Sequence, residues 1–101
     1  MMAAVTGPQD VAMQVLTALR RFPDGYSRGT FEGSPWGVTV RRSADDKRAW
    51  LFAQELAGTD IVSFNLYRLR SGEVTLKPCE MSCEKIVSFM LGFAASSAPH
   101  G

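Results

Sequence analysis

The segment KPCEMSCEK, residues 77 to 85, contains both cysteines of the chain and its most reactive side chains. A thiolate can attack an electrophile, form a disulfide or bind zinc, so Cys79 and Cys83 are candidate reactive thiols. Their C-x₃-C spacing differs from the C-x-x-C of thioredoxin-like redox sites. Zinc normally takes four ligands and the sequence supplies no further cysteine, so no metal ligand and no cofactor are assigned.

The same two cysteines have a second interpretation, as packing residues of a helix. Four residues apart on a helix, both thiols lie on one face, in line with Ile86, Val87 and Met90. Free cysteine is among the most buried residue types and packs as a small hydrophobe. This interpretation predicts that both thiols point inward and that Cys83 is the better protected, because Cys79 lies nearer the helix start.

Catalytic groups of other kinds are few. The only histidine is His100, in the C-terminal stretch AASSAPHG, which is a poor position for a triad or a general base. Asp45 and Asp46 are adjacent in a polar loop, where turn formation and solvation explain them without a metal. The sequence assigns no catalytic residue and favours a protein that is not an enzyme over one that is.

A candidate ligand site combines arginines with a patch of aromatic and amide side chains. Arginines on both sides of the loop 43–47 could hold a phosphate or a carboxylate in bidentate fashion. Rings and an amide in the following strands could line a pocket for a small ligand, or fill a core or an interface instead. The candidate ligand-binding residues are Arg41, Arg42, Arg48, Trp50, Asn65 and Tyr67.

The elements that position these residues follow from capping and periodicity. Thr6 begins a T-x-x-Q capping pattern, after which apolar residues recur at helical spacing up to Phe22. Alternating residues then predict antiparallel strands, and a second helix is expected from about Cys79 or Glu80 to Phe93. The predicted strands are a short one around 30–31, then 36–41, 48–56, 61–70 and 73–77, the last two joined by a two-residue turn at Ser71-Gly72.

The predicted fold class is α+β: an antiparallel meander of four to five strands, flanked by an N-terminal and a C-terminal helix. A chain of 101 residues supports one domain, which we place at residues 7–93. Residues 1–6 are expected to be a flexible N-terminus, and residues 94–101 a disordered tail.

The predicted pairing makes both faces of the sheet apolar. Leu56 is placed opposite Ile61, and Leu69 opposite Val74. One face then carries Trp50, Phe52, Ile61, Tyr67, Leu69, Val74 and Leu76, and the other Ala49, Leu51, Ala53, Val62, Phe64 and Leu66. Two helices can cover one such face, so we expect a homodimer to cover the other, with the Leu51/Phe64/Leu66 face as the first choice. The alternatives are one helix on each face, or a different register.

Charge and hydropathy exclude several classes of partner. Eleven Lys and Arg against ten Asp and Glu give a formal charge of +1, so nucleic acid is not expected as a partner. The apolar runs are too short to cross a bilayer, and the first residues do not form a secretory signal. Two cysteines do not make a disulfide scaffold, which favours a cytoplasmic location.

The sequence therefore predicts a small cytoplasmic, non-enzymatic interaction or regulatory module that acts as a homodimer, with a protein partner that it does not identify. The first alternative is an anion or nucleic-acid binder that uses Arg41, Arg42, Arg48 and Arg68. The second is a small-ligand or thiol site.

Overall fold

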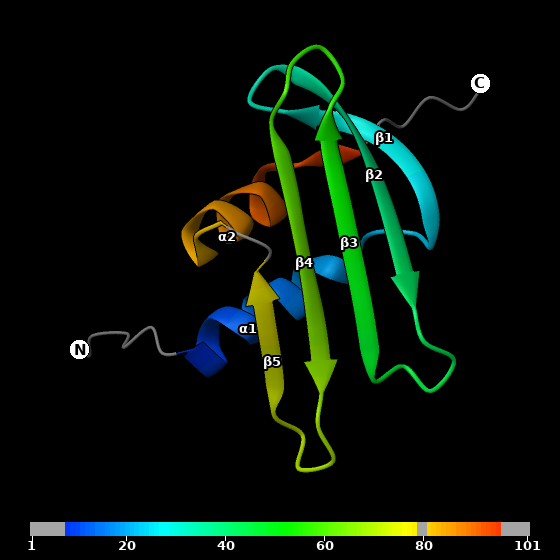
Figure 1. The fold of residues 1–101 in the computed structure, drawn as a ribbon, viewed down its shortest axis with the longest axis vertical. Helices are drawn as coiled ribbons and strands as arrows, with labels where there is room; N and C mark the ends of the chain where they lie inside the picture. The colour runs from blue at the N-terminus through cyan, green and yellow to red at the C-terminus, as the bar shows by residue number, and fades with distance from the viewer. Residues whose placement is uncertain (1–7, 79–80, 96–101) are drawn as a thin grey trace.

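The computed structural model describes residues 8–78 and 81–95, and it contains one six-stranded antiparallel sheet with two helices (Figure 1). The strand order is β5-β4-β3-β2-β1-β6. This confirms the α+β fold class, with one strand more than the four to five predicted. In chain order the elements are α1 (Pro8–Leu19), β1 (Gly25–Phe31), β2 (Ser34–Arg42), β3 (Arg48–Glu55), β4 (Ile61–Arg68), β5 (Val74–Pro78), α2 (Cys83–Gly92) and β6 (Ala94–Ala95).

Helix α1 packs through one narrow stripe. Pro8 stands at its first position, where a residue without an N–H costs no helical hydrogen bond. Ala12, Val15 and Leu19 repeat at intervals of three and four residues and are all buried. The helix ends in a tight turn in which the Phe22 N–H donates to the Leu19 carbonyl at 2.9 Å.

Helix α2 begins later than predicted. Ser82 is its N-cap, and the Ser82 hydroxyl accepts a hydrogen bond from the Lys85 N–H at 3.1 Å. The predicted start at Cys79 or Glu80 is therefore wrong, because Ser82 has an extended backbone and cannot lie inside the helix. Residues 79 and 80 themselves lie outside the described residues.

Both helices lie on the same side of the sheet (Figure 1). The face that they cover carries buried side chains, among them Val38, Leu51, Phe64 and Leu66. The alternative of one helix on each face therefore does not apply. The Leu51/Phe64/Leu66 face, expected to bind a second copy, is filled by the chain's own helices.

The pairing of β4 with β5 differs from the prediction by one residue. Tyr67 was expected opposite Leu76, but it pairs with Thr75, while Leu66 pairs with Leu76. The cause is the connection, which is not a two-residue turn but a loop in which the Leu69 N–H donates to the Glu73 carbonyl at 2.8 Å. A slip of one residue moves a whole strand to the opposite face, so Val74 and Leu76 belong to the covered face.

The pairing of β3 with β4 differs by two residues, which leaves the faces unchanged. Trp50 lies opposite Asn65 rather than Tyr67, and Phe52 lies opposite Ser63. Trp50, Phe52 and Tyr67 therefore remain on one face, as predicted. That face is less apolar than expected, because β5 contributes Thr75 and Lys77 to it.

The C-terminal part of the described chain adds a short strand to the edge of the sheet. Ala94 and Ala95 pair with β1, at the start of the segment 94–101 that was predicted as a tail. Residues 96–101 and the predicted flexible N-terminus lie outside the described residues. Among the described residues no helix is long and apolar enough to span a membrane.

Candidate functional site

We call the side of the sheet that faces away from both helices the open face. The strand register and the alternation of side chains place a mixture of rings, cations and small polar groups on it. No helix of the described chain covers these residues (Figure 1). The side chains that define the open face are Tyr26, Arg28, Thr39, Arg41, Arg48, Trp50, Phe52, Gln54, Ile61, Ser63, Asn65, Tyr67, Thr75 and Lys77.

The six predicted ligand-binding residues come together on β2, β3 and β4. All of them line one shallow depression with a volume of about 320 Å³. In the register, Arg41 lies opposite Trp50 and Trp50 opposite Asn65, so one row crosses three strands. Arg48 lies opposite Tyr67 in the next row. The size is within the roughly 300–1,000 Å³ of common ligand pockets, although the depression is open rather than enclosed.

Arg42 has a structural role that the sequence did not reveal. Its guanidinium donates to the Leu19 carbonyl at 2.8 Å and to the Phe22 carbonyl at 2.9 Å, and it pairs with Asp24. These contacts satisfy the carbonyl end of α1, where a helix leaves acceptors without partners. Arg42 lines the depression, but its charged group is turned to the covered side of the sheet.

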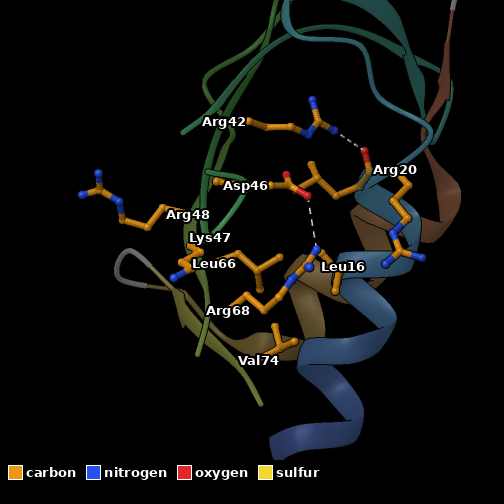
Figure 2. Close-up of a pocket in the computed structure, with 11 residues that line it drawn as sticks. Leu16, Arg20, Arg42, Asp46, Lys47, Arg48, Leu66, Arg68 and Val74 are labelled. Carbon is orange, nitrogen blue, oxygen red and sulfur yellow. Dashed lines mark hydrogen bonds and ion pairs between the residues drawn. The ribbon is translucent and has the colours of Figure 1, made fainter. Parts of the chain in front are cut away.

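The predicted cluster of four arginines is therefore divided between the two sides of the sheet. Arg68 donates to Asp46 at 3.3 Å on the side of α1, as Figure 2 shows. Arg41 and Arg48 point to the open face and form no ion pair in the described part of the chain. Only these two of the four are available as cations for an external ligand.

The pocket drawn in Figure 2 lies between α1 and the ends of β3, β4 and β5. Its walls include Leu16, Leu66 and Val74, and its accessible volume is about 50 Å³. A cavity of this size holds water rather than a metabolite, because a water molecule takes up roughly 30 Å³ of liquid. Arg42 and Arg68 at this pocket already contact groups of the fold, and Arg48 points to the open face, so we assign no ligand to the pocket.

The exchange of Arg42 for alanine tests its structural role. We expect a loss of about 2 kcal/mol in the free energy of unfolding, since hydrogen bonds from a charged donor to buried carbonyls are lost together. Chemical denaturation of Arg42→Ala measures it. The matched control is Arg41→Ala, which removes the same group one residue away on the open face and should cost about 0.5 kcal/mol or less. Equal losses would contradict the division of roles.

Tyr26 and Arg28 are open-face residues that the sequence reasoning missed. Only residues around 30–31 were predicted as a strand, whereas β1 begins at Gly25. The missed signal was the Glu32-Gly33 turn, whose φ values of 52° and 81° are those that a two-residue type I′ hairpin requires. Successive side chains of a strand point to opposite faces, so from this turn the positions of Tyr26 and Arg28 on the open face follow.

Two ring contacts shape this surface. The Trp50 and Phe52 rings are nearly parallel, with an interplanar angle of 10° and centroids 6.1 Å apart. Tyr26 lies over Gly37, because a Cβ at Gly37 would be only 2.3 Å from the Tyr26 hydroxyl. The glycine therefore leaves room for an aromatic ring that is itself 59% exposed.

The charge of the open face differs from that of the whole molecule. Its four cations are exposed, and none is ion-paired within residues 8–78 and 81–95: Arg28, Arg41, Arg48 and Lys77. The one carboxylate within the strands, Glu55, lies on the opposite face, where it accepts from the Asp60 N–H at 3.3 Å. In the loop between β2 and β3, the pKa of Asp45 is held below its usual value mainly by the Ser43 hydroxyl and the Lys47 N–H. A net charge of +1 therefore conceals an excess of cations on the open face.

The prediction that both thiols point inward is wrong for Cys83 and remains a prediction for Cys79, and the alternative of a reactive thiol stays open for both. Cys83 is exposed at the first position of α2, because the inward stripe of the helix is centred on Ile86, Phe89 and Met90. Cys79 lies outside the described residues. Among the described residues no group of His, Cys, Asp or Glu is placed to hold a metal.

The exposure of Cys83 leads to a simple expectation. We expect Cys83→Ala to change the free energy of unfolding by less than about 0.5 kcal/mol, since an exposed side chain leaves no cavity. In a Cys79→Ser background, Cys83 should be alkylated in the native protein nearly as fast as in denaturant. Slow native alkylation would restore the buried interpretation.

Comparison with known proteins supplies no additional residues for this surface. No protein-family model, no curated protein and no solved structure matches the chain. The functional inference therefore depends on the open face itself, on its rings, its cations and its missing helical cover.

Proposed function

We propose that this protein is a small, non-enzymatic binding module and that the open face is its working surface, with an anionic ligand as its partner. The observation that supports the proposal is the composition of this face: it has aromatic rings and four cations that form no ion pair with another described residue, and no strand carboxylate lies among them. Unpaired arginines next to half-buried rings are suited to planar anionic groups. The location is proposed to be cytoplasmic, as expected from the sequence.

The absence of catalysis is part of the proposal and rests on the sequence. The only histidine is His100, near the C-terminus, and the depression around Trp50 is lined by groups that bind rather than transfer protons. Arginine is protonated at all physiological pH values, so Arg41 and Arg48 can hold an anion but cannot act as general bases.

Fluorescence anisotropy with dye-labelled anionic polymers tests the proposed surface. The probes are poly-glutamate, linear polyphosphate and single-stranded DNA, each titrated with protein at low salt. We expect at least one to bind, and binding to disappear in Arg41→Glu/Arg48→Glu, which reverses two charges of the open face. The matched control is Arg20→Glu, which reverses an exposed charge in the turn directly after α1, on the other side of the sheet. If none of the three polymers binds, the proposed function is rejected.

A homodimer is the second candidate, and it would use the same face. The observation in its favour is apolar surface: Ile61 is 40% exposed, and the Trp50 and Phe52 rings are only partly buried. Its difficulty is charge, because a second copy would bring cations against cations. A stable interface also needs about 800 Å² from each partner.

Salt separates the two candidates. A dimer through the open face should become tighter as salt rises, since screening weakens the repulsion, whereas an anionic ligand should be released. Sedimentation equilibrium at micromolar concentration over a salt series measures the first effect. Tyr67→Glu should abolish such a dimer, while Leu66→Glu is not a useful probe, because Leu66 is buried beneath the helices. A monomer at every salt concentration would remove the second candidate.

A further inference from the structure

The rings of the open face are arranged as a surface on which flat groups can stack. Trp50 and Phe52 stand side by side on β3 with nearly parallel rings, and Tyr67 follows on β4. Tyr26 stands on β1, in the row that joins Thr39, Phe52 and Ser63. Besides the rings buried under the helices, aromatic residues therefore occur on three strands of the open face.

The cations lie around these rings in a regular pattern. One row crosses four strands in the order Arg41, Trp50, Asn65, Lys77, with a cation at each end. At about 4.8 Å between neighbouring strands, the two ends are roughly 14 Å apart. Arg48 stands opposite Tyr67 in the next row. A ligand that fits this pattern has flat groups in its middle and negative charges along its length.

We propose that the ligand is a single-stranded nucleic acid, with its bases stacked on the open-face rings and its phosphates held by the open-face cations. This inference rests on the proposed function and names the class of the anionic ligand. Unpaired bases stack on exposed aromatic side chains with little regard to sequence, and a positive groove follows the backbone. Both features are present here on one sheet face.

The sequence-based expectation against nucleic acid depended on the net charge of +1, which averages over the whole surface. The acidic residues that balance the charge are elsewhere: Asp24 pairs with Arg42, Asp46 with Arg68, and Asp60 with Lys85. Within residues 8–78 and 81–95 the cations of the open face form no ion pair of this kind. An acidic peptide would satisfy the cations but would give the rings no flat partner.

Duplex nucleic acid is a poorer fit to the same surface. The bases of a duplex are stacked on one another, so rings on a protein surface cannot reach their flat sides without unpairing them. Weak duplex binding, as expected from the sequence, is therefore consistent with the inference. Preference for the single strand is its distinguishing property.

The test compares three labelled probes of equal length by fluorescence anisotropy: a 12-mer of deoxythymidine, a 12-mer with abasic sugars, and a DNA hairpin duplex. About 12 nucleotides is within the roughly 4–16 that one OB fold covers. We expect the deoxythymidine strand to bind at least about 10-fold more tightly than either control, since only it offers free bases. In a Trp36→Phe variant, Trp50 is the only tryptophan, and stacking should quench its fluorescence.

Variants separate the ring contribution from the charge contribution. Trp50→Ala should weaken the binding of the deoxythymidine strand about 10-fold and leave the affinity for the abasic strand unchanged. Arg41→Ala/Arg48→Ala should weaken the binding of both strands and reduce the slope of log K against log salt by about 1.4. Trp50→Leu, which keeps apolar bulk, guards against a folding defect, and Arg20→Ala is the charge control. A thermal melt of each variant establishes that it is folded.

Each other outcome overturns the inference in a recognisable way. Equal binding of the abasic strand, or tighter binding of poly-glutamate, would keep the proposed anion-binding face and reject nucleic acid. Equal or tighter binding of the hairpin would reject stacking. Binding that survives both the Trp50 and the arginine variants would place the site elsewhere. If no anionic polymer binds, the proposed function fails together with the inference.

Discussion

Replacing Phe89 by alanine is expected to lower the free energy of unfolding by about 4 kcal/mol, the largest effect that we expect from a single core substitution. Phe89 is fully buried on α2 and lies at the centre of an aromatic cluster. Its ring centroid is 4.9 Å from that of Trp36, 5.1 Å from that of Phe31 and 5.2 Å from that of Phe93. Alanine would leave a large cavity among three rings that are anchored on different elements.

Urea denaturation followed by tryptophan fluorescence measures this loss. The matched control is Leu91→Ala, two residues further along the same helix, where the side chain is 61% exposed. We expect its cost to be about 0.5 kcal/mol or less, because it removes little buried surface and alanine favours a helix. Similar losses at the two positions would mean that the inward face of α2 is assigned wrongly.

Replacing Gly29 by alanine is expected to cost about 3 kcal/mol, because the added methyl group has no room. A Cβ at this position would be 2.3 Å from the Ala94 carbonyl oxygen and 2.4 Å from the Phe93 ring. Gly29 is paired with Trp36 on one side and with Ala95 on the other. The strand β6 would have to leave the edge of the sheet, or the Phe93 ring would have to leave the core.

Gly37→Ala is the matched control for Gly29→Ala. A Cβ at Gly37 would meet only the Tyr26 side chain, which is exposed and free to rotate away. We expect a change of less than about 0.5 kcal/mol, because alanine also reduces the conformational entropy of the unfolded chain. Hydrogen exchange of the Ala94 and Ala95 amides should accelerate in Gly29→Ala alone. A stable Gly29→Ala protein with unchanged exchange would contradict the pairing of β6 with β1.

The sequence by itself determined the elements and most of the candidate surface. The helical period located α1, and period-2 alternation located β2, β3 and β4 with the loop 43–47 between the first two. The same alternation grouped Trp50, Phe52 and Tyr67 on one face, and the six proposed ligand residues do line one depression. These features are local, because each depends on residues that are neighbours along one strand or one turn.

Only the tertiary structure decided which face is covered. Alternation divides a strand into two sets of side chains, but it does not say which set faces the helices when both are apolar. The register of β5 added a second error. A five-residue loop was taken for a two-residue turn, so Val74 and Leu76 were assigned to the wrong face. Loop conformation depends on long-range packing as well as on turn residues.

The roles of the arginines show the same limit at single residues. Arg41 and Arg42 are neighbours in the sequence, and alternation alone predicts that they point to opposite faces. The contact of Arg42 with the carbonyl end of α1 joins elements that are far apart in the chain. The same is true of the open face, where Arg28 and Lys77 lie on the same side of the sheet as Arg41 and Arg48. A positive face on a nearly neutral protein is a property of how the chain is folded, because folding places the carboxylates of the described residues in loops, in the helices and on the covered side.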